Sequence, residues 1–113
     1  MIVRNFNDEE VIATTYVAHR GGIARMLLTS KELEAMDFFA IAQLMPEKEI
    51  ETHIDPYEEI YFILEGSGIM QVGDEYREVK DGDAIFIPAG KPHGLKNNSD
   101  NRCTFLVVAA TPK

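Results

Sequence analysis

The stretch Gly82–Asn97, GDAIFIPAGKPHGLKN, decides how this chain folds. It contains a short apolar run, Ala84–Ile87, and continues into a connection rich in glycine and proline that ends at His93. A short apolar run bounded by such residues is typical of a strand followed by a tight turn. The stretch therefore predicts a strand, a turn and then an imidazole fixed at the end of that turn.

A second stretch carries three further polar side chains at odd-numbered positions. They are His53, Asp55 and Glu59 of the segment HIDPYEE. Alternate residues of a strand point to one face, so the three can project in the same direction. Together with His93 they make a mixed nitrogen and oxygen donor set, the kind that holds Mn, Fe, Co, Ni or Zn. Taken singly, each would be an ordinary surface residue, and it is their spacing that indicates a metal site.

The metal hypothesis makes a geometric demand on this second stretch. On a straight strand, residues 53 and 59 would lie roughly 20 Å apart, too far to share an ion. Pro56 fixes its own φ and forces Asp55 into an extended conformation, which makes a bend there plausible. The hypothesis therefore predicts a chain reversal at residues 55–57.

Outside these stretches the chain consists of short runs of strand type separated by turn residues. The expected strands are Val11–Ala18, Ile23–Leu28, Phe38–Met45, Tyr57–Leu64, Gly68–Val72, Glu75–Val79, Ala84–Ile87 and Thr104–Ala110. Gly73-Asp74 is a two-residue hairpin spacer, and Lys31–Ala35 is expected to be a loop or one helical turn. Such spacing indicates an all-β sandwich or barrel. No linker or repeat divides residues 1–113, so we expect a single domain.

The segment Tyr57–Leu64 is apolar on both faces. Its odd-numbered face holds Tyr57, Glu59, Tyr61 and Ile63, and its even-numbered face holds Glu58, Ile60, Phe62 and Leu64. A strand that is apolar on both faces must be covered on both sides. If the odd face lines a barrel interior, the even face needs a second cover. We expect a second copy of the chain, in a homodimer; the alternative is cover by the N-terminal strands of the same chain.

Composition excludes several classes of partner. The net charge is −8, from 11 basic and 19 acidic residues, and no basic cluster exists to bind nucleic acid or an anionic membrane. No apolar run is long enough to span a bilayer, and the N-terminus lacks a signal-peptide core. Cys103 is the single cysteine, so an intrachain disulfide is impossible and a cytoplasmic location is expected. Its apolar neighbours predict a buried thiol.

The two polar stretches resemble the motifs of the cupin superfamily. The first motif, G-x5-H-x-H-x3,4-E-x6-G, is matched by His53, Glu59 and Gly66, with Glu47 in place of its first glycine and Asp55 in place of its second histidine. The second motif, G-x5-P-x-G-x2-H-x3-N, is matched throughout by Gly82, Pro88, Gly90, His93 and Asn97. The resemblance covers about residues 36–110 and leaves the N-terminal strands, about residues 11–28, to strand patterning alone.

This resemblance implies a jelly-roll β-barrel of two antiparallel sheets with one divalent ion in its mouth. Carried over residue by residue, the ligands are His53, Glu59 and His93, and Asp55 occupies the fourth position. A carboxylate there can serve as a ligand for Zn, Mn, Fe or Ni and would oppose an anionic ligand. Alternatively, Asp55 accepts a hydrogen bond from a ligating histidine, or the site has degenerated and holds no metal.

Two classes of function follow. The first is a metal-dependent isomerase, epimerase or lyase acting on a small oxygen-rich substrate such as a sugar or keto acid. Within this class a non-haem iron dioxygenase is an alternative, since two histidines and Asp55 also fit a two-histidine, one-carboxylate triad. The second class is a non-catalytic small-ligand-binding or sensor protein.

Several further residues are placed near the expected barrel mouth. Tyr57 and Tyr61 share the face of Glu59, where they act as catalytic proton donors or simply as core aromatics. His19, Arg20 and Arg25 lie in or beside the N-terminal strands. They are either anion contacts at the mouth or residues of a solvated loop.

Overall fold

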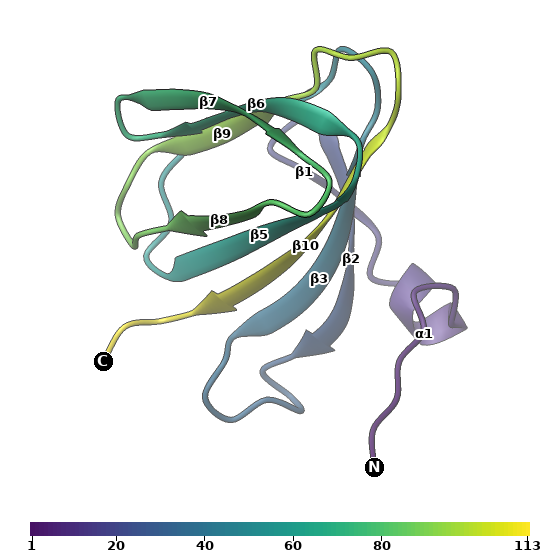
Figure 1. The fold of residues 1–113 in the computed structure, drawn as a ribbon. Helices are drawn as coiled ribbons and strands as arrows, with labels where there is room; N and C mark the ends of the chain where they lie inside the picture. The colour runs from purple at the N-terminus through teal and green to yellow at the C-terminus, as the bar shows by residue number, and fades with distance from the viewer.

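The computed structural model describes residues 1–113, which form a barrel of antiparallel strands. The elements are α1 (Glu9–Ile12), β1 (Tyr16–Ala18), β2 (Gly22–Thr29), β3 (Phe38–Leu44), β4 (Glu49–His53), β5 (Glu58–Glu65), β6 (Ser67–Val72), β7 (Glu75–Lys80), β8 (Ala84–Ile87), β9 (His93–Lys96) and β10 (Cys103–Ala110). One sheet has the order β1-β2-β3-β10-β5-β8 and the other β4-β9-β6-β7. Figure 1 shows the two sheets facing each other. The predicted all-β jelly-roll barrel is confirmed.

The chain passes repeatedly from one sheet to the other. After β3 it enters the four-stranded sheet as β4, returns as β5, leaves for the β6–β7 hairpin, and alternates again through β8, β9 and β10. The hairpin closes where Val72 pairs with Glu75 across Gly73-Asp74, as the sequence predicts. Gly73 has φ +59, a left-handed conformation that glycine adopts readily and that suits such a tight loop. This winding brings residues 53, 59 and 93 to one end of the interior.

The interior between the sheets is filled by apolar side chains. The largest fully buried ones are Leu44, Ile63, Ile87, Leu95 and Phe105, each at most 1% exposed. Removing such area from water stabilises the fold by about 25 cal/mol per Å². Cys103 is also fully buried, as expected from its neighbours.

Strand β5 has the two-faced character that its sequence predicts. Glu59, Tyr61 and Ile63 are buried in the barrel, whereas Ile60 and Phe62 are 45% and 39% exposed on the outside. The N-terminal strands do not cover this outer face, so that alternative is wrong. They continue the same sheet at its far edge instead.

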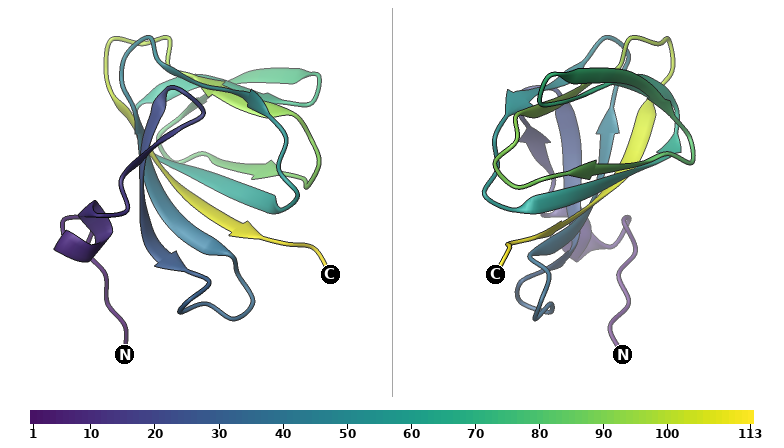
Figure 2. Two further views of the ribbon diagram at one scale, coloured as in Figure 1. Left: turned by 180° about the vertical axis from the view of Figure 1, so that it is seen from behind. Right: turned by 60° about the vertical axis from the view of Figure 1, so that its left-hand side comes forward.

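The expected strand Val11–Ala18 is wrong in its first half. Residues Glu9–Ile12 form the short helix α1, which lies outside the barrel (Figure 2). Buried Val11 anchors the helix, and the acidic first turn suits the positive end of the helix dipole. Thr14 donates its hydroxyl hydrogen bond to the carbonyl of Val11 at 2.6 Å, just beyond the last turn. No helix of the chain is long and apolar enough to cross a membrane.

Strands β4 and β9 lie outside the predicted set. Both are largely polar, and in β4 only Ile50 is buried. They pair with each other, with Glu49 opposite Lys96. A Cβ atom on Gly94 would lie 2.9 Å from the carbonyl oxygen of Ile50, so the close approach of the two strands depends on glycine. The segment Lys31–Ala35 contains turns and no strand, in line with the expected loop.

Candidate metal centre

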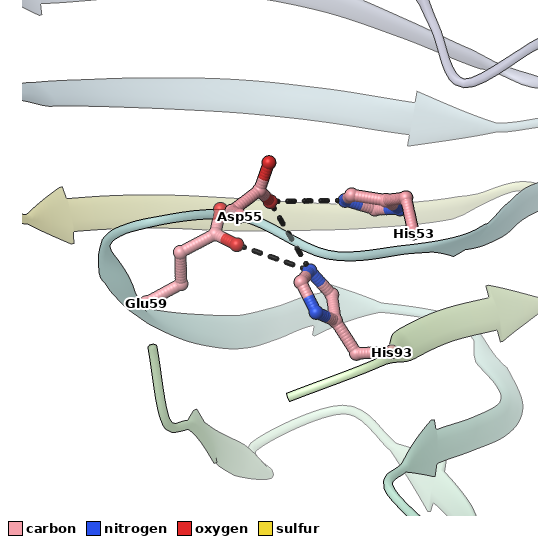
Figure 3. Close-up of side chains that lie close together, drawn as sticks. All are labelled: His53, Asp55, Glu59 and His93. Carbon is pink, nitrogen blue, oxygen red and sulfur yellow. Dashed lines mark ion pairs between the residues drawn. The ribbon is translucent and has the colours of Figure 1, made fainter. Parts of the chain in front are cut away.

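The four polar side chains that the sequence singles out meet at one end of the barrel interior. His53 ends β4, Glu59 is the second residue of β5, His93 begins β9, and Asp55 lies in the loop between β4 and β5. One donor atom from each lies within 4.8 Å of the others. Figure 3 shows the two carboxylates and the two imidazoles pointing toward a common centre.

The predicted chain reversal is confirmed, and it explains how distant positions come together. Strand β4 ends in the four-stranded sheet and β5 begins in the six-stranded sheet, so residues 54–57 connect the two sheets. The carbonyl of Asp55 accepts a hydrogen bond from the backbone N–H of Gly90 at 2.9 Å, which ties this crossing to the loop before His93. His53 also pairs directly opposite His93 in the β4–β9 ladder.

The distances within the cluster are short. The Nε2 atom of His53 lies 3.0 Å from Oδ2 of Asp55, and the Nε2 atom of His93 lies 3.4 Å from the same oxygen. His93 Nε2 also lies 3.1 Å from Oε1 of Glu59. Both histidines thus direct the same nitrogen, Nε2, toward the carboxylates.

Backbone carbonyls fix the orientation of both imidazole rings. His53 Nδ1 lies 2.8 Å from the carbonyl oxygen of Glu51, and His93 Nδ1 lies 2.9 Å from that of Lys91. A carbonyl oxygen only accepts hydrogen bonds, so each Nδ1 carries the hydrogen. In a neutral ring, Nε2 then presents a lone pair to the cluster. Such carbonyl support is the usual arrangement behind a metal-binding histidine.

Two buried atoms of the cluster lack hydrogen-bond partners. They are Oε1 of Glu59 and Nε2 of His93, which face each other. Both atoms are acceptors when the histidine is neutral, so their approach requires a cation between or beside them. A shared proton or a divalent metal ion meets this requirement. The residues present therefore fit a metal ion.

Charge interactions perturb the pKa values of this pair. Burial raises the pKa of Glu59. The neighbouring His93 lowers it and the negative charge of Asp55 raises it, and the net shift is upward. Burial lowers the pKa of His93, but the neighbouring Glu59, the Lys91 carbonyl and Asp55 outweigh it, so the net shift is upward. Both directions indicate that, without a metal, the pair retains a proton.

A cavity of about 60 Å³ adjoins the cluster and is lined by His53, Asp55 and Glu59. The predicted residues Tyr57 and Tyr61 both stand in its wall. Burial, followed by the nearby carboxylates, raises the pKa of both phenols. Their hydroxyls therefore stay protonated and are available as hydrogen-bond donors.

Two polar cavity residues come from β1 and the turn that follows it, and they carry less signal in the sequence. Tyr16 lines the cavity from β1, and burial, then Glu59 and Asp55, raises its pKa. The His19 ring stacks on His53, with centroids 3.4 Å apart and planes at 12°. The two arginines expected near the barrel mouth lie outside the cavity. Arg20 is exposed and forms an ion pair with Glu51 at 3.7 Å. Arg25 donates outside the cavity, to the carbonyl of Phe6 at 2.8 Å.

The chain is similar to several known proteins in sequence and in structure. An uncharacterized protein of Methanocaldococcus jannaschii is 55% identical over 55 residues, which cover 49% of this chain and 44% of that protein. An oxalate-binding protein of Thermotoga maritima is 30% identical over 111 residues, covering 96% of this chain and 92% of that protein. The crystal structure of a predicted oxalate decarboxylase from Thermotoga maritima superposes with a TM-score of 0.82 at 27% identity, covering 99% of this chain and 100% of that one.

A family model described as the cupin domain matches residues 40–109. This range holds both polar stretches and every strand from β4 to β9. The chain belongs to the cupin family.

Proposed function

We propose that this cupin binds one divalent transition metal ion, Zn, Mn, Fe or Ni, through His53, Asp55, Glu59 and His93. The observation that carries the proposal is the unpartnered pair of His93 Nε2 and Glu59 Oε1, 3.1 Å apart and buried. The geometry of Asp55 supports the ligand alternative, because its Oδ2 atom lies within 3.4 Å of both imidazole Nε2 atoms. The donor set is hard and mixed, which suits these ions.

We propose further that the protein is an enzyme acting on a small oxygen-rich substrate. A bound ion would supply Lewis acidity, which polarises a carbonyl and favours isomerase, epimerase or lyase chemistry. Tyr57 and Tyr61 would position the substrate and hold a proton on their hydroxyls at the cavity wall. The apolar remainder of the wall, including Phe105 and Val107, would keep bulk water from the reacting atoms.

The size of the cavity restricts the substrate. At about 60 Å³ it is far smaller than the roughly 300–1,000 Å³ of sites for drug-sized ligands. A molecule of a few non-hydrogen atoms, such as a short hydroxy or keto compound, suits it better than a whole sugar. Larger substrates would have to extend out of the barrel mouth.

Non-catalytic ligand binding is the second candidate function. It is favoured by the 30% identity with a protein whose name states only that it binds oxalate, over nearly the whole of both chains. The two candidates differ in what happens to a ligand. Turnover changes it chemically, whereas a binding protein returns it intact.

Metal analysis followed by product detection tests the proposed function. Protein purified without an affinity tag would be analysed by inductively coupled plasma mass spectrometry, with Asp55→Ala beside it. We expect about one metal ion per chain, lost in the variant. Small hydroxy and keto compounds would then be incubated with the loaded protein and followed by NMR, and iron-loaded protein would be tested for oxygen consumption. Absence of metal, even after reconstitution, would contradict the metal site, and unchanged compounds would favour the binding protein.

We also propose a homodimer formed through the outer face of the six-stranded sheet. Ile60, Phe62 and Leu64 on β5 and Phe86 on β8 are 39–58% exposed, and the ladder places Ile60 opposite Phe86. The half-buried Val108 extends the patch onto β10 opposite Ile60. Its four main side chains expose on the order of 400 Å² of apolar surface, within the roughly 300–600 Å² of the largest apolar patch on a typical monomer, a patch that is often functional. Two such faces supply much of the core of a standard interface of about 1,600 Å².

A further inference from the structure

We propose that the cavity selects a small neutral molecule with adjacent hydroxyl and carbonyl oxygens, and rejects dianions such as oxalate. The inference rests on the proposed metal site and concerns the charge of its ligand. It follows from three features of the chain: the charge of the donor set, the absence of cations from the cavity wall, and the hydroxyl groups that replace them.

The donor set cancels the charge of a divalent ion. Asp55 and Glu59 contribute one negative charge each, and both histidines are neutral as ligands because Nδ1 keeps its hydrogen on a backbone carbonyl. A centre with four such ligands therefore has no net charge. An anionic ligand gains little Coulomb attraction from it.

No lysine or arginine lines the cavity. Arg20 is turned to Glu51 with 84% of its side chain exposed. Lys91 is exposed, and its Cδ atom lies 3.9 Å from the position of a Cβ on Gly73, over the β6–β7 hairpin. The remaining basic group at the cavity is His19, whose ring is stacked on His53 with centroids 3.4 Å apart. A dianion in this cavity would keep an uncompensated charge, which is costly in an apolar enclosure.

The wall offers neutral donors instead of cations. Tyr16, Tyr57 and Tyr61 line the cavity, and phenol hydroxyls are uncharged at neutral pH. Apolar residues fill the space between them: Ala24, Ala40, Ala42, Phe105 and Val107. Hydroxyl donors set in an apolar wall suit a ligand with oxygen acceptors and hydrocarbon between them. The oxalate named for the relatives is therefore not the expected ligand of this chain.

Isothermal titration calorimetry with zinc-loaded protein at pH 8 tests the inference. The probes are dihydroxyacetone, which is neutral, and oxalate, which has the same number of non-hydrogen atoms and two charges. Zinc retained by the protein is measured after each titration, because oxalate itself chelates the ion. We expect tighter binding of dihydroxyacetone than of oxalate to the native protein. Oxalate binding more tightly would overturn the inference.

A pair of variants at one position of the cavity wall separates charge from size. Ala18 lines the cavity and is not one of the four proposed metal ligands. Ala18→Lys adds one positive charge at the cavity, and Ala18→Met adds a side chain of similar length without charge. We expect the affinity for oxalate to be at least about tenfold higher in Ala18→Lys than in Ala18→Met, with less than a threefold difference for dihydroxyacetone. Asp100→Asn makes the same change in net charge on an exposed loop and should alter neither affinity. Equal oxalate affinity in the two Ala18 variants would overturn the inference, whereas failure of the native protein to bind zinc would overturn the proposed function itself.

Discussion

His93 Nε2 lies 3.1 Å from Glu59 Oε1, and neither atom has a hydrogen-bond partner although both are buried. The two residues reach this position from different sheets, on β9 and β5. Such a contact between two acceptors is stable only with a positive charge shared between them. The proposed metal site provides that charge, and the predictions below depend on it in different ways.

Replacing Glu59 by Gln should remove a metal ligand with little change in shape. The amide oxygen carries no charge and binds a divalent ion poorly, so we expect metal affinity to fall by at least about a hundredfold. Competition with a fluorescent chelator measures this affinity. Glu58→Gln is the matched control, because Glu58 directly precedes Glu59 on β5 and is exposed outside the barrel. Equal affinity in the native protein and in Glu59→Gln would remove Glu59 from the ligand set.

Replacing Tyr57 by Phe should lower turnover and leave the metal in place. The hydroxyl lost is a proposed proton donor, and loss of such a group costs about 10² to 10⁴ in rate. The ring would still pack against Phe38, whose centroid lies 5.6 Å away in an edge-on arrangement. Turnover is measured on a substrate found by the NMR screen, with metal content as the control. A native rate in Tyr57→Phe would show that Tyr57 serves packing alone.

Much of the site was predictable because its signals are local. The alternation along β5 separates the buried Glu59 and Tyr61 from the exposed Ile60 and Phe62, and strand geometry alone gives this pattern. The metal hypothesis predicts the reversal that brings His53 and Glu59 together, and the restriction that Pro56 places on its neighbours makes a bend there plausible. Side-chain period and local backbone preference therefore account for the two faces of β5 and the bend before it, whereas the jelly-roll barrel and the ligand set followed from the resemblance to the cupin motifs.

The rest depends on contacts between distant segments. His19 reaches His53 because the β1–β2 turn packs on β4, where a Cβ on Gly21 would lie 1.8 Å from the carbonyl oxygen of Glu49. His19 has φ +45, in the left-handed region that non-glycine residues seldom adopt, and propensity does not predict this. The polar strands β4 and β9 likewise form through pairing with distant strands, β4 with β9 and β9 also with β6, and lack an apolar pattern of their own.

Cys103 should resist thiol reagents in the folded protein. Burial, followed by Glu65 and Asp81, raises the pKa of its thiol to about 11. At pH 8 only about 0.1% of the group would then be the reactive thiolate, and reagent access is blocked as well. A titration with Ellman's reagent should find no fast-reacting thiol in native buffer and one in denaturant. Rapid labelling of the native protein would contradict the buried position of Cys103.

A charge on the outer sheet face should dissociate the proposed homodimer. Phe62 is 39% exposed at the centre of β5, and a glutamate there would bury an unpaired charge in the interface. Sedimentation equilibrium should give a dimer for the native protein and a monomer for Phe62→Glu. Tyr76→Glu is the control, because this exposed aromatic lies on β7 of the other sheet. A native protein that sediments as a monomer at all concentrations would contradict the dimer.

Anomalous diffraction from crystals of zinc-loaded protein, recorded at the zinc absorption edge, tests the metal site most directly. We predict a single strong peak about 2.0–2.2 Å from Nε2 of His53, Nε2 of His93 and one carboxylate oxygen each of Asp55 and Glu59. The unpartnered atoms of His93 and Glu59 would then both be occupied as ligands. A zinc peak elsewhere on the molecule, and none at this cluster, would contradict the proposed metal site.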